Sequence, residues 1–317
     1  MQARDWDARM LELFAKIRTH MAARSALAFA SILFAGSVLP MHAQEANQGA
    51  ALRADAGQKW GQVVREIIHH ELDAEAKDTS LWCYRKLEEK KDDKQRLFVA
   101  CQARGAEIDR LLAVNGKELD ERQQQEEDQR IESLLGNKRQ LEKEERKHRQ
   151  DAKQAAELLK IIPDAFVFQM EGRDGDKIKL KFAPNPAFHP SDHQAMVFHH
   201  MEGTLTLQQK EGRLAEINGR LNSNVKFGEG LLGHLDQGGT FLVRLEEVSP
   251  HCWEMTTLDV HMNGKALFFH TIDVREKEID SDFRPLPASV TIQQAAEMTR
   301  DKITEAAAMR EFGGSKK

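Results

Sequence analysis

The stretch FVFQMEGRDGDKIKLKF, residues 166–182, decides the fold of this chain. Large apolar residues alternate with other side chains, as Phe166 and Phe168 do before its centre, and Ile178 and Leu180 after it. This period of two is typical of a β-strand that buries one face. Asp174-Gly175, between the two runs, is a strong two-residue hairpin signal. The stretch therefore predicts two antiparallel strands that bury the same face.

The same alternation predicts further strands along the chain. Strand-like segments also precede the stretch, at 80–90, 95–104 and 107–114, and others follow it to about residue 274, with turn signals at Glu211-Gly212 and Asn263-Gly264. A parallel sheet needs a helix between successive strands, and these strands run on without one. We therefore expect a meander of about ten or eleven antiparallel strands. The residues expected on its apolar face are Phe166, Phe168, Ile178, Leu180, Phe182, Leu205 and Leu207.

Helices are predicted to cover that face. Residues 51–76 carry an amphipathic pattern, 117–162 are a charged insertion with a break at Gly136-Asn137, and 291–312 form a last helix before a short tail. A long antiparallel sheet twists and curls, and its apolar face must be covered. The predicted fold class is α+β, a strongly curved sheet like an unclosed barrel with helices over its concave face. Residues 44–290 are expected to form this domain, and the insertion at 117–162 is expected to form a charged helical hairpin within it. Residues 291–317 are expected to form the C-terminal helix and tail.

The sequence MAARSALAFASILFAGSVLPMHAQEA, residues 21–46, has the build of a secretory signal peptide. Arg24 supplies a basic start, an apolar run follows, and Ala43 is the small residue before the expected cleavage point. The run is too short to cross about 30 Å of hydrocarbon, which disfavours a membrane anchor. We expect an exported, periplasmic protein in which residues 1–43 are an N-terminal extension and signal peptide. Met1 and Met21 both remain open as the true start.

The charge balance argues against a nucleic-acid partner. The net charge is −5 at pH 7, so no overall basic surface exists to neutralise phosphates. Within 117–153, acidic and basic side chains nearly cancel, and pairs such as Glu142 and Arg146 stand at i,i+4 spacing. This pattern favours solvated helices over a nucleic-acid arm.

Three cysteines, Cys83, Cys101 and Cys252, are too few for a disulfide framework. If the strands that carry Cys83 and Cys101 form a hairpin about a turn at 91–93, the two cysteines lie opposite each other. Opposed residues reach bridging distance only at the close, non-hydrogen-bonded positions, and a register slip of one abolishes the contact. A Cys83–Cys101 disulfide and two buried thiols are both open, and we favour the thiols.

The stretch FGEGLLGHLDQGG, residues 227–239, contains a G-x-G-x-x-G match at Gly228, Gly230 and Gly233. This spacing cradles a dinucleotide pyrophosphate when a helix follows the glycines. Here only residues 234–237 separate Gly233 from the next glycine pair, so no helix has room to form. We predict no nucleotide and interpret the glycines as sites of bulges, tight bends or close backbone approach.

Histidines are the next candidates for chemistry. His189, His193, His199 and His200 could bind Zn²⁺ or Cu²⁺ as neutral imidazoles, but their spacing fits no compact site and no carboxylate or thiol pattern completes it. We interpret them as loop histidines. No nucleophile elbow or cysteine–histidine motif is present. We therefore predict no catalytic residue, no metal site and no cofactor, and expect a non-enzymatic protein.

Several segments between residues 81 and 287 together resemble a family of uncharacterised exported bacterial proteins. These segments are RLLAVNGKEL, LLKIIPDAFVFQMEG, KLKFAPNPAFHP, MEGTL, VKFGEGLLGHLDQGGTF, MNGKALFFHTI and SDFRPLP. The order of strands is similar to that of the LolA and RseB fold of outer-membrane lipoprotein sorting. That resemblance implies a curved sheet whose helices cover an apolar cavity for acyl chains. No functional residue carries over, and the insertion at 117–153 departs from the simple carrier pattern.

Two functions follow as hypotheses. In the first, the concave apolar face binds a hydrophobic or lipidated ligand, such as a lipid, an acyl chain or a lipoprotein. In the second, the core is filled by the chain's own helices, and the protein is a structural or interaction module of the cell envelope that docks through the charged hairpin. Fold analogy alone does not decide between them.

Overall fold

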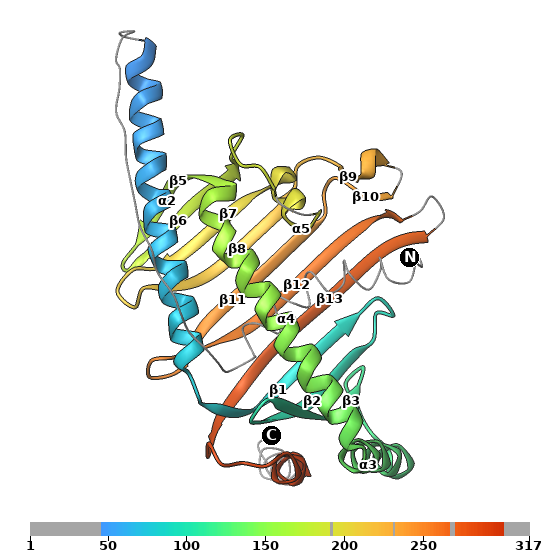
Figure 1. Ribbon diagram of the computed structural model, residues 1–317. Coiled ribbons are helices and arrows are strands. Elements are labelled where there is room, and N and C mark those ends of the chain that lie inside the picture. The colour runs from blue at the N-terminus through green and yellow to red at the C-terminus, as the bar shows by residue number, and fades with distance from the viewer. Residues whose placement is uncertain (1–45, 191–192, 231, 267–269, 301–317) are drawn as a thin grey trace, which may run out of the picture.

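The computed structural model describes residues 46–190, 193–230, 232–266 and 270–300, and these residues form an α+β fold around one antiparallel sheet (Figure 1). The predicted signal peptide at 21–43, and the part of the last predicted helix beyond residue 300, lie outside the described residues.

Thirteen strands make up the sheet, and all of their pairings are antiparallel. Their bounds are β1 (Leu81–Lys90), β2 (Gln95–Ala103), β3 (Ala106–Val114), β4 (Lys117–Glu118), β5 (Phe166–Asp174), β6 (Lys177–Pro184), β7 (Met201–Gln208), β8 (Arg213–Leu221), β9 (Val225–Phe227), β10 (Gly233–Leu235), β11 (Thr240–Ser249), β12 (Cys252–Ala266) and β13 (His270–Leu286). The main order is β4-β3-β2-β1-β13-β12-β11-β8-β7-β6-β5; off this order, β10 pairs with β12, and β9 pairs with β10. Because β4 and β5 stand at opposite ends of this order, the sheet is unclosed, as predicted.

Helices occupy the segments that lack strand alternation. Their bounds are α2 (Ala46–Lys77), α3 (Glu121–Gly136), α4 (Lys138–Ala165) and α5 (His193–Met196), with short 3-10 turns at η1 (Val197–His200) and η2 (Gly228–Gly230). Residues 292–300 are also helical. Helices therefore form where the sequence analysis expects them, apart from the short α5 and the two 3-10 turns.

The junction of α3 and α4 follows from local capping. Asp120 begins α3 with a capping box, in which its side chain accepts from the Gln123 N–H and Gln123 bonds back to the Asp120 N–H. α3 ends at Gly136, and the Asn137 side chain then accepts from the Gln140 N–H to begin α4. The break predicted at Gly136-Asn137 is confirmed. Figure 1 shows α4 crossing the sheet obliquely, while α3 is seen nearly end-on beside β3.

The main core lies between one face of the sheet and two helices. α2 and α4 cross the same face of the sheet in Figure 1. Val64 and Ile68 from α2, and Leu159 from α4, are buried in one cluster with the apolar side chains of β5 to β13. The first half of α4 is mostly exposed and highly charged, whereas its second half is buried, because apolar residues begin to recur at helical spacing only from Ala152.

The chain does not turn at Asn263-Gly264 as predicted, although the strands predicted on either side are present. Asn263 and Gly264 lie inside β12, opposite Asp273 and Ile272 of β13. Gly264 serves another purpose, because a Cβ at that position would stand 2.2 Å from the carbonyl oxygen of His234 on β10. Because Gly264 has no side chain, β10 can lie close to β12 at this position. A turn rule based on neighbouring residues cannot predict that contact.

The strands β1 to β3 have a smaller core of their own on the opposite side. Cys83 and Cys101 project to this side, where they are buried with Val290 and with Ala295 of the helical residues 292–300. Side chains of a strand alternate between its two faces, so Tyr84 and Lys86 of β1 point to the other face. That face is continuous with the face that carries the main core. Both faces of these strands are therefore buried, one against apolar side chains and the other among charged ones.

Candidate functional site

The seven residues predicted on the apolar face lie together in the main core. Each of them is at most 5% exposed, and all belong to the cluster that packs against α2 and α4. The rings of Phe166 and Phe182 have centroids 4.6 Å apart. The chain's own helices therefore cover the face that the sequence analysis assigns to a ligand.

An apolar cavity of about 40 Å³ remains between α4, η1 and the sheet. No polar atom lines this cavity. Its lining residues are Leu158, Leu159, Ile162, Phe166, Phe182, Val197, Phe198, Met201, Leu205, Ile217, Phe241 and Val243. Three of the seven predicted residues, Phe166, Phe182 and Leu205, are among them. A cavity of this character stays dry and accepts apolar guests.

The same face of the sheet changes from apolar to charged at β13. In one row of opposed residues, Val243 on β11 is followed by Leu258 on β12, and then by Glu278 on β13 and Glu88 on β1. Glu278 is 2% exposed and Glu88 is 7% exposed. Carboxylates at this depth are rare unless they are paired or bind a cation. The apolar cavity and the charged part therefore lie on the same face of the sheet.

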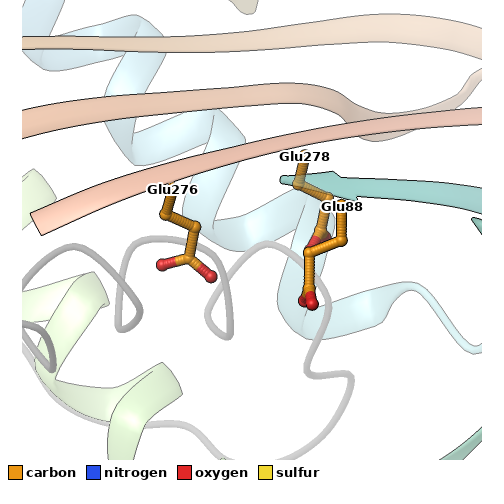
Figure 2. Close-up of side chains that lie close together, drawn as sticks. All are labelled: Glu88, Glu276 and Glu278. Carbon is orange, nitrogen blue, oxygen red and sulfur yellow. The ribbon is translucent and has the colours of Figure 1, made fainter. Parts of the chain in front are cut away.

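Three carboxylates gather in this charged part. Oxygens of Glu88, Glu276 and Glu278 lie within 4.8 Å of one another (Figure 2). Carboxylate oxygens of this kind suit hard cations such as Ca²⁺ and Mg²⁺. However, the Nζ of Lys90 lies 2.9 Å from a Glu88 oxygen, so an ammonium group already supplies positive charge. This cluster was not predicted from the sequence, although Glu276, Lys277 and Glu278 are buried, exposed and buried in turn, as successive residues of a strand are.

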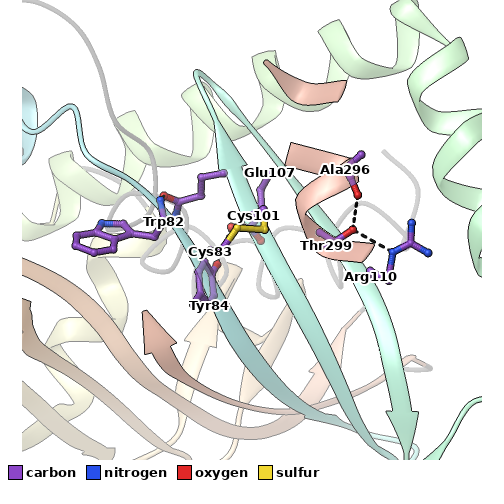
Figure 3. The surroundings of a disulfide bond; sticks show 9 residues. Trp82, Cys83, Tyr84, Cys101, Glu107, Arg110, Ala296 and Thr299 are labelled. Atoms are coloured by element: carbon purple, nitrogen blue, oxygen red, sulfur yellow. Dashed lines mark hydrogen bonds between the residues drawn. A yellow bond between two sulfur atoms is a disulfide. The ribbon is translucent and has the colours of Figure 1, made fainter. Parts of the chain in front are cut away.

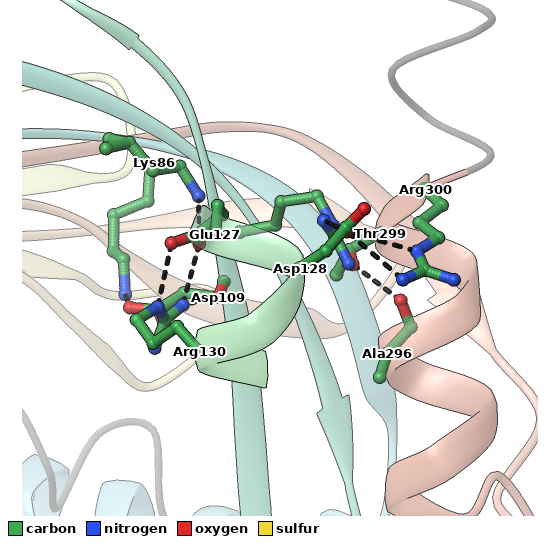
Figure 4. A network of polar contacts seen from close by, with 10 residues as sticks. Lys86, Asp109, Glu127, Asp128, Arg130, Ala296, Thr299 and Arg300 are labelled. Atoms are coloured by element: carbon green, nitrogen blue, oxygen red, sulfur yellow. Dashed lines mark hydrogen bonds and ion pairs between the residues drawn. The ribbon is translucent and has the colours of Figure 1, made fainter. Parts of the chain in front are cut away.

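A second polar group surrounds Tyr84 and Lys86. The Tyr84 hydroxyl donates to Glu107 at 2.6 Å, and Lys86 Nζ lies 3.2 Å from both Glu107 and Asp109. Burial raises the pKa of Tyr84 well above its usual value, and the charges of Glu107, Asp280 and Glu278 raise it further. Arg130 on α3 reaches the Asp109 carboxylate at 3.3 Å and thereby ties α3 to this group (Figure 4).

Cys83 and Cys101 form a disulfide (Figure 3). They lie directly opposite each other in the register expected from the turn at 91–93, with Cα atoms 4.1 Å apart. This corrects the preference for two buried thiols. Beside the disulfide, Arg110 on β3 donates to the Thr299 hydroxyl at 3.0 Å, and Thr299 donates to the Ala296 carbonyl. These bonds hold the helical residues 292–300 against β3, which pairs with the bridged strand β2.

The clustered histidines do not form a metal site in the described part of the chain. The carboxylate cluster is the group of close metal-ligating side chains found there, and no histidine belongs to it. His200 Nδ1 lies 2.8 Å from the Ser223 hydroxyl, and burial, followed by the charge of His199, lowers the pKa of His200. His199 instead packs against the Phe188 ring. The side chain of His193 lies outside the described residues.

The glycine-rich stretch forms a small hairpin. β9 and β10 pair with each other across η2, and β10 pairs with β12, so no helix faces a phosphate. Gly233 has φ +143°, and a Cβ there would stand 2.5 Å from the Lys265 carbonyl oxygen. The interpretation of Gly233 as a site of close backbone approach is confirmed.

No protein-family model, curated protein or solved structure matches this chain. In the ranges that the structure describes, no helix has the length and apolar character needed to span a membrane.

Proposed function

We propose that this chain is a non-enzymatic exported protein that holds an acyl chain, or the lipid part of a lipidated partner, against the apolar face of its sheet. The observation that carries the proposal is the cavity under α4, whose lining is apolar throughout. Apolar ligands bind in such sites by removing their surface from water, at roughly 25 cal/mol per Å². A polar ligand would lose its hydrogen bonds to water and regain none there.

The size of the cavity defines how binding occurs. A volume of about 40 Å³ holds a chain end rather than a whole acyl chain. A longer ligand has to displace the part of α4 that carries Leu158, Leu159 and Ile162. The first half of α4 packs little against the body, so we expect α4 to move as a lid while the sheet stays in place.

The LolA-like curvature belongs to the same proposal. A sheet curved like an unclosed barrel presents a concave face, and helices across its mouth then act as a cover. Two opposed glycines, Gly203 on β7 and Gly219 on β8, support local bending of the sheet. A Cβ at Gly219 would stand 2.2 Å from the Phe241 ring, and one at Gly203 would stand 2.0 Å from the Asn218 carbonyl oxygen.

An exported location is part of the proposal, and the disulfide supports it. Structural disulfides persist in oxidising compartments such as the periplasm and are rare in the bacterial cytosol. The Cys83–Cys101 bridge is buried, with exposures of 2% and 0%. It is consistent with a protein that folds after export.

The fluorescent fatty acid cis-parinaric acid tests the proposal. We expect it to bind the native protein, and Val243→Leu, which adds a methylene to the cavity wall, to weaken that binding about tenfold, since 1.4 kcal/mol corresponds to a factor of ten. Val260→Leu is the matched control, because Val260 is buried on the neighbouring strand but does not line the cavity. Equal affinity of both variants and the native protein, or no binding by any of them, would contradict the proposal.

A second function, a structural or interaction module of the envelope, is favoured by one observation. All seven residues predicted to contact a ligand are covered by α2 and α4. In this case the exposed first half of α4 is the docking surface. Reversing two exposed charges there, with Lys143→Glu and Lys147→Glu, should abolish capture of an envelope partner and leave cis-parinaric acid binding unchanged.

A further inference from the structure

A groove of about 1370 Å³ runs around the β5 edge of the sheet, from α2 to the side of the sheet away from α4. It begins at Gly57 and Trp60 on α2, passes around the edge strand β5, and continues over β6, β7 and β8 to Thr240. Its strand residues include Gln169, Lys181 and Thr204, which alternate with the buried residues of the core face. The groove and the apolar cavity meet at Phe182, which lines both, whereas Gln169, Lys181 and Thr204 line the groove and not the cavity.

Amide and hydroxyl side chains dominate the uncharged polar lining of the groove. They are Gln169, Thr204, Asn218 and Thr240, together with Asn185, whose amide already bonds to the Asp164 carbonyl and the Ala187 N–H. Each of these groups both donates and accepts hydrogen bonds. The hydroxyl groups of a sugar do the same, so such a lining matches a ligand that is hydroxylated along its whole length.

Apolar surface is also exposed in the groove, in small separate areas. Val167 is 47% exposed and Met170 is 42% exposed, and these are two of the three exposed large hydrophobic residues in the described part of the chain. Trp60 adds part of an indole ring. Areas of this size suit the C–H faces of sugar rings, whereas a lipid chain requires a continuous apolar lining.

The charges of the groove favour an anion. Lys179 and Lys181 share one carboxylate, that of Glu171, at 3.1 and 3.2 Å. Arg220 is balanced by Glu202 at 2.6 Å. The two lysines and one glutamate leave one positive charge in excess at the middle of the groove. A single excess charge is far below what binding to a nucleic-acid backbone requires.

A peptide that adds as a strand to β5 fits less well. Gly57 of α2 packs near the Phe168 carbonyl oxygen, where a Cβ would be 3.7 Å away. A bulge between Met170 and Gly172 then interrupts the strand. Bulges and covering helices protect edge strands from pairing.

From these observations we infer that the groove binds an oligosaccharide that carries carboxylate groups, as a uronic acid polymer does. The ligand's hydroxyls would bond to the amides and hydroxyls, its ring faces would lie on Val167 and Trp60, and a carboxylate would reach Lys179 and Lys181. Val167, Lys179 and Lys181 do not line the cavity of the proposed function, although Phe182 lines both sites, so either inference can fail alone.

Calorimetric titration with β-1,4-linked tetraglucuronate, and with cellotetraose as its neutral counterpart, tests the inference. We expect the acidic tetramer to bind at least about tenfold more tightly, because its carboxylates form charge-assisted hydrogen bonds with the lysine ammonium groups. The double variant Lys179→Gln and Lys181→Gln should remove that preference. Lys177→Gln is the matched control, because Lys177 is exposed on the same strand and face but does not line the groove.

Three outcomes would overturn the inference. The first is no binding of tetraglucuronate at millimolar concentration. The second is an equal loss of affinity in the Lys177→Gln control and the double variant. The third is binding of tetraglutamate as tight as that of tetraglucuronate, which would show that charge alone is recognised. All variants stand on the exposed sheet face, so unchanged thermal unfolding would verify that they are folded.

Discussion

The carboxylate of Glu71 on α2 accepts two hydrogen bonds from the guanidinium of Arg213 on β8, at 2.8 and 2.6 Å, and a third from the Leu214 N–H at 3.1 Å. Glu71 is 2% exposed. The pair holds α2 to the sheet at a point where Glu71 is buried and 11% of the Arg213 side chain is exposed. Removing one partner leaves the other charge buried, so Glu71→Ala should lower the free energy of unfolding by about 3 kcal/mol, measured by urea denaturation.

The exposed pair of Arg65 and Asp164 is the control for this prediction. It also joins α2 to the end of α4, but both side chains are more than half exposed. Asp164→Ala should change the free energy of unfolding by no more than about 1 kcal/mol. Equal losses in Glu71→Ala and Asp164→Ala would contradict the assignment of Glu71 as a buried fastening point.

Tyr84 should keep its proton well above the usual tyrosine range. Its pKa is raised by burial and by neighbouring carboxylates, so the native state binds the proton more tightly than the unfolded state, whose tyrosine titrates near pH 10. The resulting stabilisation is complete below pH 10 and is lost as the pH rises through the folded value. Tyr84 is the one tyrosine of the chain, so absorbance near 295 nm reports it alone. Ionisation near pH 10 in native protein, as in urea, would disprove the prediction.

The disulfide should leave one reactive thiol in unreduced, denatured protein, that of Cys252. Thiol titration should therefore count one before reduction and three after it. The bridge closes the loop from residue 83 to residue 101, which lowers the conformational entropy of the unfolded chain and destabilises it by about 3 kcal/mol. The double variant Cys83→Ser with Cys101→Ser should therefore lower the free energy of unfolding by about that amount. A count of three before reduction would show that the bridge is absent.

Gly233→Ala should damage folding because of both its backbone angle and its neighbour. A side chain at φ +143° is strained, and its Cβ would meet the Lys265 carbonyl oxygen. We expect a loss of about 2 kcal/mol in the free energy of unfolding. Gly172→Ala is the control, because nothing lies within 4 Å of a Cβ there. If NAD raised the melting temperature of the native protein, the structural interpretation of these glycines would be wrong.

Local patterns predicted the strands well, because the alternation of Ile178, Leu180 and Phe182 reports burial of one face directly. They also predicted the register that brings Cys83 opposite Cys101, since the turn at 91–93 sets it. They failed at Gly264, where a strand from elsewhere in the chain, β10, decides the local geometry. Contacts between distant segments leave little trace in a local pattern.

The candidate site was predicted only in part, again because local patterns do not report contacts between distant segments. The residues of the apolar face were recognisable from their period, but how completely α2 and α4 fill it depends on how side chains pack. The charged cluster at Glu88 and Glu278 was missed, because its members come from β1 and β13, the first and last long strands of the chain. No spacing rule connects residues that far apart.

The pairing of β1 with β13 also governs the order of folding. β1 forms a local hairpin with β2, but its other edge stays open until β13 is available, since Lys90 pairs with Glu276 and Leu81 with Leu286. Loop closure over such a separation is slow, and an open strand edge is prone to aggregate meanwhile. A chain truncated before residue 270 should therefore be unable to complete its sheet, and a partner that shields the edge of β1 would speed maturation of the full chain.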